Sequence, residues 1–340
     1  MSRPTDRSTD RPTDPDTERA EHRTTVDAPA KAVYELLVDV ENWPQIFPPS
    51  VHVERLEGGP LSEQDAPEGQ AGQEATGERI RIWATANGTA KTWTSRRTLI
   101  PSRGVIEFRQ EVSSPPVAAM GGTWIVEAYG EQRCRVRLLH DYRAVDDDPD
   151  SLAWIAAAVD RNSKAELEAL KQHAEAAAQG RQTLLSFEDS TRIAGRARDV
   201  FDFINAADLW PERLPHVARV RLEDDEGLQL LEMDTRSPDG STHTTTSVRV
   251  CLPDDRIVYK QIQVPALMTL HTGRWEFQED ADGVLATSQH TVVINEANIA
   301  TVLGADADLD AAREAVRHAL GTNSLTTLAQ AKAHIEAGRA

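Results

Sequence analysis

The sequence predicts an α+β fold that occurs twice along the chain. Two stretches, VYELLVDVENWPQIFPPSVHVERLE and VFDFINAADLWPERLPHVARVRLED, match each other along their length. Their offset is constant, because 210 − 43 for Trp43 and Trp210 and 201 − 34 for Tyr34 and Phe201 both equal 167. In each copy a first strand leads into short helical segments, a run of strands follows, and a long helical pattern ends the copy. Helices at both ends of an antiparallel meander predict an α+β domain.

The repeat extends beyond this first segment. TWTSRRTLIPSRGVIEFRQEV matches TTTSVRVCLPDDRIVYKQIQV and places Arg97 at the position of Arg249, on an offset of 152 (249 − 97). His140, on the last predicted strand of the first copy, is matched by His290 in the second. Two copies at this spacing indicate two domains of one fold rather than a short solenoid repeat.

Length and composition agree with this division. A chain of 340 residues predicts about two domains of ordinary size, and 39% hydrophobic residues allow each to bury its own core. Residues 1–20 are mostly Arg, Asp, Thr and Pro without an apolar stretch, which predicts a disordered tail and not a signal peptide. The predicted parts are a tail at 1–20, a first domain at 21–179 and a second domain at 183–340.

Several classes of protein are disfavoured. The net charge of −18 argues against nonspecific nucleic-acid binding, and no apolar run is long enough to cross a bilayer. Cys134 and Cys251 are the only cysteines and lie in no spaced pair, which predicts reduced strand residues in a cytoplasmic protein. No zinc motif, dinucleotide-binding loop or phosphate loop occurs, so we expect neither a metal nor a cofactor.

Local patterns predict each element of the first copy. Val33, Leu37 and Val40 recur at helical spacing, which predicts a helix over 28–40. Asn87–Gly88 is a hairpin signal between two stretches rich in strand-forming residues. The other predicted elements are strands at 22–27, 51–56, 79–85, 89–99, 105–112, 123–128 and 133–142, a short helix at 41–47, a loop at 58–78, a turn at 101–104, and a long helix at 151–178.

The second copy repeats this order. Its predicted elements are a strand at 184–193, helices near 196–212, strands between 217 and 294, and a last helix near 307–337. A long helix against a strongly curved antiparallel sheet leaves a cavity between them, the kind of concave site where small ligands bind.

Specific segments resemble a known family. VENWPQIFPPSVHV, RIWATANGTAKTWTSRRTL, SSPPVAAMGGTW and EMDTRSPDGSTHTTTSVRV, with the tandem layout, are similar to the di-domain aromatase/cyclases of bacterial type II polyketide synthases. The resemblance covers residues from about 22 to about 338. It implies two tandem helix-grip domains of the START or Bet v 1-like fold, each a curved sheet wrapped around a long C-terminal helix with an internal cavity.

The same resemblance implies an activity. The expected substrate is a linear poly-β-ketone held on an acyl carrier protein, and other components of the polyketide synthase are expected partners. The enzyme would join C7 to C12 by aldol addition and then aromatise the ring by loss of water. Members of the family need no metal or redox cofactor, which fits the absence of such motifs.

Arg236 is the first catalytic candidate that the resemblance implies. In TRSPDG it matches the position where single-domain relatives carry a pocket arginine, whereas the first copy has Trp83 or Ala84 there. A guanidinium is always charged, and its planar fork can hold two oxygens while an enolate or alkoxide forms. The second domain is therefore expected to carry the Arg236-centred chemistry. The alternative is an exposed arginine that precedes a turn.

Arg249 and Arg97 are further candidates, for catalysis and for substrate binding respectively. Each follows a serine by two residues on a long predicted strand. On the concave face such an arginine is a buried charge, which is costly unless it is paired or faces a ligand. The alternative is a solvated arginine on the outer face.

His271 and His243 are the candidates for proton transfer during dehydration, for which histidine is the usual side chain. The first copy has Met120 in place of His271. The alternative for each is a hydrogen-bonded structural histidine. His140 and His290 occur in both copies, which suggests a role in the fold.

Aromatic and basic residues of the first copy are predicted to bind the substrate with Arg97. Stacking on rings and hydrogen bonds from guanidiniums suit a flat, oxygen-rich chain. The alternative is that at least two of the three tryptophans belong to the core. The residues are Trp83, Trp93, Trp124, Arg81 and Arg109.

Docking of an acidic carrier protein to this acidic chain needs a local basic patch. The alternative is that these arginines form solvated faces. The candidates are Arg192, Arg196 and Arg198, or Arg213, Arg219 and Arg221.

Two other functions fit the predicted fold. One is a non-catalytic carrier or chaperone that binds a hydrophobic polyketide or lipid in the same cavity. The other is a stress-response or lipid-transfer protein, which the specific segments do not favour. Inward Arg and His side chains favour the enzyme, and a purely apolar lining favours the carrier.

Overall fold

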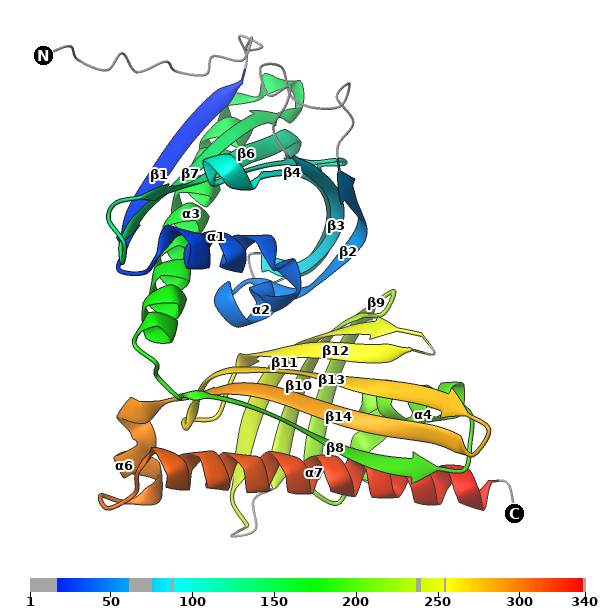
Figure 1. Cartoon of the computed structure of the whole chain (residues 1–340). Helices are drawn as coiled ribbons and strands as arrows, with labels where there is room; N and C mark the ends of the chain where they lie inside the picture. The colour runs from blue at the N-terminus through cyan, green and yellow to red at the C-terminus, as the bar shows by residue number, and fades with distance from the viewer. Residues whose placement is uncertain (1–16, 61–74, 87–88, 237–239, 254, 339–340) are drawn as a thin grey trace, which may run out of the picture. The chain divides into compact units, whose positions relative to one another are not determined.

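The structure is a computed structural model that describes residues 17–60, 75–86, 89–236, 240–253 and 255–338. It contains two seven-stranded antiparallel sheets, each followed by a long helix (Figure 1). The predicted α+β fold of two tandem helix-grip domains is thereby confirmed.

The first repeat follows the predicted order. A short helix, α1, and a one-turn helix, α2, precede most of the sheet. The sequence allows α2 to begin at Trp43, because Pro44 stands in its first turn, where a missing N–H costs nothing. Its elements are β1 (Glu18–Val26), α1 (Ala30–Val38), η1 (Val40–Asn42), α2 (Trp43–Ile46), β2 (Ser50–Pro60), β3 (Thr76–Ala86), β4 (Thr89–Ile100), η2 (Pro101–Arg103), β5 (Val105–Gln110), β6 (Val117–Ala128), β7 (Cys134–Ala144), η3 (Val145–Asp147) and α3 (Pro149–Ala178).

The second repeat has the same order of strands, with a short helix, α6, added before the last helix and no described element in the place of η2. In Figure 1, α7 runs alongside the second sheet. Its elements are β8 (Leu184–Ile193), α4 (Ala197–Asn205), η4 (Ala207–Leu209), α5 (Trp210–Arg213), β9 (Val217–Asp225), β10 (Leu228–Arg236), β11 (Thr242–Leu252), β12 (Arg256–Gln263), β13 (Met268–Asp280), β14 (Gly283–Ile294), η5 (Glu296–Asn298), α6 (Ile299–Leu303) and α7 (Leu309–Ala337).

The strand order is the same in both sheets. The first sheet runs β1-β7-β6-β5-β4-β3-β2 and the second β8-β14-β13-β12-β11-β10-β9. The first strand of each repeat therefore pairs with the last, as in Glu18 opposite Tyr142 and Val284 opposite Ile193. Each sheet is thus an antiparallel meander in which the first and last strands of the repeat are neighbours.

Alternation along the strands defines an inner face of each sheet, which we take as the face whose side chains touch helices of the same repeat. In the first repeat Arg97 of β4 contacts the carbonyl of Leu37 in α1, and His140 of β7 contacts Ser163 in α3. In the second repeat the side chain of Arg249 contacts the carbonyl of Ile204 in α4. Residues at even distances from these along each regular strand share the inner face.

The inner face of the second repeat carries a large apolar core. Its buried members come from α4, the strands and α7, since each element turns one apolar side inward. They include Val200, Phe201, Ile204, Trp210, Leu231, Ile257, Trp275, Phe277, Leu328 and Ile335.

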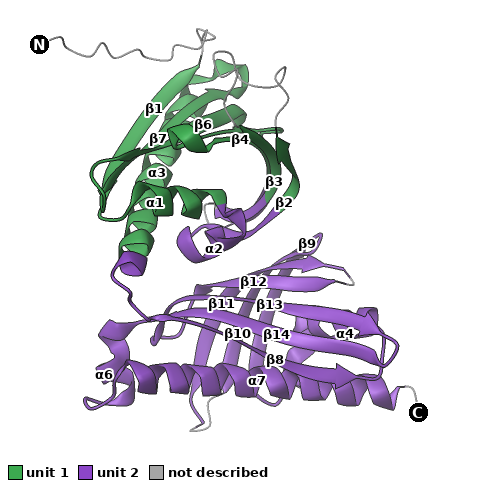
Figure 2. Ribbon diagram, viewed as in Figure 1, with its two compact units in different colours: residues 1–38, 55–81, 93–175 green, residues 39–54, 82–92, 176–340 purple. Residues whose placement is uncertain are grey.

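The chain divides into two compact units (Figure 2). Unit 1 comprises residues 1–38, 55–81 and 93–175, and unit 2 comprises 39–54, 82–92 and 176–340. Two stretches of the first repeat thus group with the second unit. The domain limits at 21–179 and 183–340 stay a prediction.

Three local expectations need comment. Of the predicted loop at 58–78, β2 extends to Pro60 and β3 begins at Thr76, while 61–74 lies outside the described residues. The strand expected at 123–128 begins earlier, at Val117. The prediction missed its first half because Gly121 and Gly122 weaken the strand pattern of the sequence. The tail and the hairpin signal at 87–88 also lie outside the described residues, except that Glu18 to Ala20 join β1.

Candidate functional site

Three of the predicted substrate-binding residues lie on the inner face of the first repeat. Arg97 is 3% exposed. Trp93 lies four residues before it on β4 and therefore on the same face of the strand. Trp124 pairs with Ile106 on one side and Leu138 on the other, within the inner row of the sheet. These side chains are therefore in position to line an interior site.

The other three face the opposite way. Arg81 and Trp83 alternate with the inward Ile80 and Ile82 on β3, so they lie on the outer face. Arg109 forms an ion pair with Asp141, which alternates with the inward His140. The structure does not bring these three together with Arg97.

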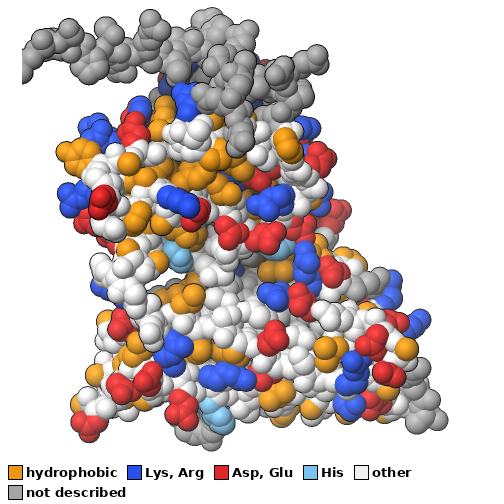
Figure 3. Space-filling model, in the orientation of Figure 1, with side chains coloured by type: hydrophobic (Ala, Val, Ile, Leu, Met, Phe, Trp, Pro, Cys, Tyr) orange, Lys and Arg blue, Asp and Glu red, His pale blue; other side chains and the backbone are white. Residues whose placement is uncertain are grey.

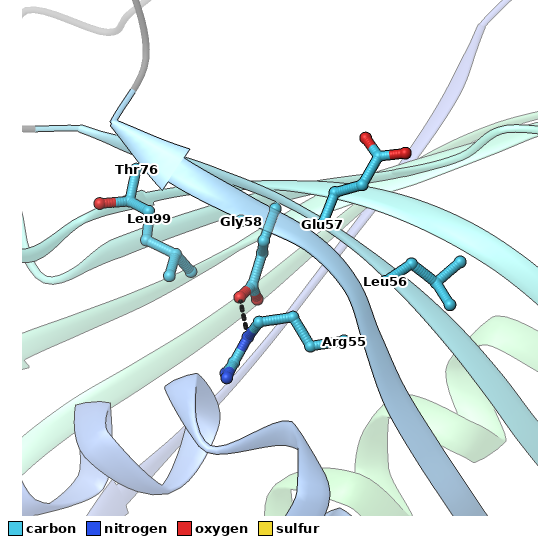
Figure 4. A pocket seen from close by; sticks show the side chains of 7 residues that line it. Arg55, Leu56, Glu57, Gly58, Thr76 and Leu99 are labelled. Atoms are coloured by element: carbon cyan, nitrogen blue, oxygen red, sulfur yellow. Dashed lines mark hydrogen bonds and ion pairs between the residues drawn. The ribbon is translucent and has the colours of Figure 1, made fainter.

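A pocket of about 380 Å³ lies among β2, β3 and β4 of the first repeat (Figure 4). Leu56 and Leu99 supply apolar wall, whereas Arg55, Glu57 and Glu78 supply charge. The full lining is Arg55, Leu56, Glu57, Gly58, Thr76, Glu78 and Leu99. A concave site with apolar walls and a few polar groups is the usual form of a small-molecule site.

Glu78 joins two arginines at this pocket. Its Oε2 accepts a hydrogen bond of 2.8 Å from Arg55 Nε, drawn as a dashed line in Figure 4. Its Oε1 lies 3.1 Å from Arg97 Nη1, an ion pair without hydrogen-bond geometry. Among the described residues nothing occupies the two terminal nitrogens of Arg55, whose side chain is 39% exposed. Arg55 therefore keeps donors available at the pocket.

Arg97 is held in the interior behind this pocket. Its Nη2 donates to the carbonyl of Leu37 at 2.7 Å. Burial lowers the pKa of Arg97 to about 10, and the carboxylate of Glu78 opposes that shift. Arg97 therefore stays charged at neutral pH, and it ties β4 to the last turn of α1.

Arg249 repeats this contact in the second repeat, but with a neutral partner. Its Nη2 donates to the carbonyl of Ile204 at 2.8 Å, and its Nη1 donates to Gln229 Oε1 at 2.8 Å. Its guanidinium lies 5.1 Å from the centre of the Trp210 ring, a cation–π distance. Burial lowers the pKa of Arg249. Gln229 thus stands where the first repeat has Glu78.

A buried polar network occupies the inner face of the second repeat. His271 Nε2 lies 2.9 Å from His290 Nδ1, and the Tyr259 hydroxyl lies 3.0 Å from the same nitrogen. His290 Nε2 lies 2.8 Å from the Ser324 hydroxyl of α7 and 3.2 Å from that of Ser288. The network therefore links β12, β13 and β14 to α7.

The network is neutral at pH 7. Burial, with His290 adding to it, holds the pKa of His271 well below its ordinary value, and burial lowers the pKa of His290 to about 4. Burial likewise raises the pKa of Tyr259. With a proton on His271 Nε2, its Nδ1 is a buried acceptor, and no described residue bonds to it. A neutral imidazole nitrogen of this kind can accept a proton or a hydrogen bond.

Glycine makes the network possible. Tyr259, Gly273 and His290 lie in one row across three strands. A Cβ at Gly273 would lie 2.4 Å from the Tyr259 hydroxyl oxygen and 2.6 Å from the Gln289 carbonyl oxygen. The missing side chain therefore lets Tyr259 cross over β13 to reach His290.

The first repeat has the same row without the network. Phe108 crosses Gly122, and its ring centre lies 5.7 Å from that of His140. Ser163 of α3 lies 3.3 Å from His140, at the place of Ser324 in α7. Phe108 and Met120 stand where the second repeat has Tyr259 and His271, so only the His–Ser pair is common to both repeats.

Arg236 and His243 lie apart from these interiors. Arg236 is exposed at the end of β10, and its Nη1 donates to the carbonyls of Pro215 and Val217 at 3.0 and 2.7 Å. His243 is exposed near the start of β11. Their catalytic roles stay a prediction.

The arginines considered for carrier docking are already paired with acidic neighbours. Figure 3 shows positive and negative side chains interspersed on the viewed face. Arg213 instead lies 5.0 Å from the centre of the Phe203 ring. The pairs are Arg192–Asp280, Arg196–Asp199, Arg198–Asp202, Arg219–Asp234 and Arg221–Glu223.

No group of three or more His, Cys, Asp or Glu side chains among the described residues could hold a metal ion. No helix in the described part of the chain is long and apolar enough to span a membrane.

Comparison with known proteins places the chain in a family. The family described as polyketide cyclase / dehydrase and lipid transport matches residues 17–175 and 185–333, once for each repeat, and the chain belongs to it. It is a di-domain aromatase/cyclase, a bifunctional cyclase/dehydratase of type II polyketide synthesis.

Its relatives share the di-domain layout. A granaticin polyketide synthase bifunctional cyclase/dehydratase from Streptomyces virginiae is 51% identical over 91% of this chain and 97% of the relative. The actinorhodin counterpart from Streptomyces coelicolor is 41% identical over 93% and 96%.

Two solved di-domain structures are similar to this chain over nearly its whole length. The aromatase/cyclase BexL from the BE-7585A pathway is 56% identical, with a TM-score of 0.83 over 94% of this chain and 99% of that one. StfQ from the steffimycin pathway is 34% identical, with a TM-score of 0.80 over 94% and 99%.

Sequence reasoning missed Arg55, Glu78 and Tyr259. The available signal was alternation, since Glu78 lies two residues before Ile80 on a strand whose even positions are otherwise apolar or small. A lone acid in such a row needs a buried partner.

The Glu78 contacts lead to a stability prediction. Glu78→Gln removes the carboxylate that is joined to both Arg97 and Arg55, and removing one partner of a buried ion pair costs about 3 kcal/mol. Urea unfolding should show this loss. Glu57→Gln is the matched control, because the Glu57 side chain is 63% exposed and pairs with Arg79 only at 3.5 Å. Equal stability of the two variants would contradict the assignment.

The glycine row leads to a second prediction. Gly273→Ala should lower the free energy of unfolding by about 1–3 kcal/mol, because the added methyl overpacks the crossing of Tyr259. Gly59→Ala is the control, since a Cβ there meets nothing within 4 Å. Urea titrations of both variants test this, and a Gly273→Ala curve that overlays the control would refute it.

Proposed function

We propose that this cyclase/dehydratase closes the first ring of a carrier-bound poly-β-ketone between C7 and C12 and then aromatises that ring by dehydration. The observation that carries the proposal is the first-repeat pocket, where Arg55 offers free donors beside the apolar Leu56 and Leu99. The names of the granaticin and actinorhodin relatives support aromatic polyketide intermediates as substrates.

The pocket suits the requirement of ring closure. A methylene between two carbonyls is already acidic, so the enzyme must mainly select one folded conformer of the chain. Arg55 supplies a permanent charge for carbonyl and enolate oxygens, and Glu78 fixes its position through Nε. We assign this orienting role to Arg55 in preference to Arg236, which backbone carbonyls already hold.

Dehydration needs a proton donor and an acceptor, and the second repeat supplies candidates for both. His271 Nδ1 is the acceptor, and the Tyr259 hydroxyl, which lies 3.0 Å from His290 Nδ1 in the same network, is a donor that stays protonated at neutral pH. The first repeat has Met120 and Phe108 at these places. We therefore propose that ring closure belongs to the first repeat and loss of water to the second.

Reconstitution with a minimal type II polyketide synthase and its acyl carrier protein tests regiospecificity. A C7–C12 aromatic first ring should appear only when this protein is present, as followed by mass spectrometry and NMR. Chains reduced and unreduced at C9 should both be supplied. Unchanged shunt products on both chains would contradict the C7–C12 proposal.

Arg55→Leu tests the orienting role in the same assay. Losing one charge-assisted hydrogen bond costs about 1.5–3 kcal/mol, so the yield of the first ring should fall about 10- to 100-fold. Arg103→Leu is the control, because Arg103 is exposed in η2 and lies outside the pocket. Equal yields from both variants would remove Arg55 from the mechanism.

His271→Met, which copies the first repeat, tests the second step. The variant should accumulate a ring product that is heavier by one water, because the acceptor for dehydration is gone. His318→Met, at an exposed position of α7, is the control. A fully aromatised product from His271→Met would exclude this histidine from dehydration.

A further inference from the structure

Glu166 interrupts the buried stripe of α3. The buried residues of this helix recur at intervals of three and four, and they are Ile155, Val159, Ser163, Leu167, Leu170 and Ala174. Glu166 falls on the same spacing, three residues after Ser163 and four before Leu170. A carboxylate therefore stands on the side of the helix that is otherwise apolar or small.

This stripe faces the inner face of the first sheet. Ser163 Oγ lies 3.3 Å from His140 Nδ1 on β7, and Ile155 packs with Tyr142 of the same strand. Glu166 lies less than one turn beyond Ser163, on the same side of the helix. Its carboxylate thus belongs to the interior of the repeat that also contains the pocket.

The carboxylate of Glu166 is free of protein partners. Its side chain is half-buried, and no described residue forms a hydrogen bond or ion pair with it. Other glutamates of α3 are engaged: Glu168 accepts from Gln172 at 2.7 Å, and Glu175 accepts from the backbone N–H of Asp27 at 2.9 Å. Its oxygens are also absent from the set of fully buried unpaired atoms, so they keep accessible surface.

The second repeat lacks this group. The Asn–Ser step at Ser163 recurs at Ser324 on an offset of 161 (324 − 163), which places Thr327 at the position of Glu166 (327 − 166). The Thr327 hydroxyl bonds within its own helix to the carbonyl of Asn323 at 2.9 Å. The fold therefore forms without a carboxylate at this position, and an unpaired one is a cost that structure alone does not explain.

We propose that Glu166 is the catalytic acid–base group of ring closure in the first repeat. The inference rests on the proposed function, because it takes as substrate the poly-β-ketone proposed for the first repeat. The carboxylate removes one proton from the methylene between two carbonyls, and the enolate carbon forms the new C–C bond to a ketone carbon. The resulting alkoxide takes the proton back from Glu166, so the step needs no further reactant.

Its environment suits both halves of this transfer. Burial alone raises the pKa of Glu166 to about 7, and a group whose pKa lies near the working pH can both accept and return a proton. The histidines on the inner rows of β1 and β7 are His22 and His140, and α3 itself carries His173. His22 is held by Asp160 at 3.0 Å, and burial keeps the pKa values of His140 and His173 below their ordinary value.

Glu166→Gln is the test in the reconstituted system. The rate of first-ring formation by the full chain should fall at least 100-fold, the usual contribution of general acid–base catalysis. The wild-type rate should also rise as pH increases through about 7, and this dependence should vanish in the variant. Glu168→Gln, on the exposed side of the same helix, should keep both the wild-type rate and its pH profile.

A stability measurement gives an independent readout. Because its pKa is raised above the ordinary 4.5, Glu166 favours the folded state when protonated, and this contribution is lost as pH rises from about 4.5 through about 7. The melting temperature of Glu166→Gln should therefore exceed that of the wild type at pH 8, with a smaller difference at pH 5. A variant that melts lower at both pH values shows a structural role and overturns the proposal.

The outcomes separate the two hypotheses. If the wild type makes no C7–C12 ring, the proposed function fails. If the wild type makes the ring and Glu166→Gln makes it equally fast, only the role of Glu166 fails. Loss of ring closure with raised stability at pH 8 supports both.

Discussion

A buried arginine that ties a long strand, β4 or β11, to the first helix of its repeat is the contact on which both repeats depend. Arg97 donates to the carbonyl of Leu37, and Arg249 donates to that of Ile204. The two carbonyls lie on the same offset of 167 (204 − 37) and belong to the last turns of α1 and α4, where carbonyls lack partners within the helix. A cation there also meets the negative end of the helix dipole. The helix is thus held against the inner face at the cost of burying a charge.

The two repeats stabilise the buried arginine with different partners, and the polar groups of their interiors differ as a result. Glu78 neutralises Arg97 and reaches on to Arg55 at the pocket, whereas Gln229 gives Arg249 only a neutral acceptor. The first repeat therefore keeps several charges near an open pocket. In the second, the added polar groups form a neutral network that is closed by the serines of β14 and α7. One scaffold thus supports two chemically different interiors.

Sequence reasoning reached the fold because the fold depends on patterns that are local. Helical spacing, strand alternation and the repeated Trp-Pro step gave the element order, and alternation allowed an inward Arg97 and Arg249. It could not decide which face Arg81, Trp83 or Arg109 would take, since alternation fixes relative sides and not which side is inner. The Tyr259–His290 contact was out of reach because it depends on the register of three strands around Gly273.

The residues that sequence patterns explain least are those where function is best sought. The inward side of α3 carries apolar or small residues except at Glu166. A charged residue in such a stripe conflicts with the pattern of the helix, and proteins keep such conflicts mainly at functional sites. Glu166 forms no ion pair with any described residue that would offset its burial, unlike Glu78, and the second repeat has Thr327 at its position. The repeated fold makes this contrast informative, because the Thr327 hydroxyl at the same position bonds only within its own helix. The difference between the repeats therefore separates what the fold requires from what the chemistry of the first repeat adds.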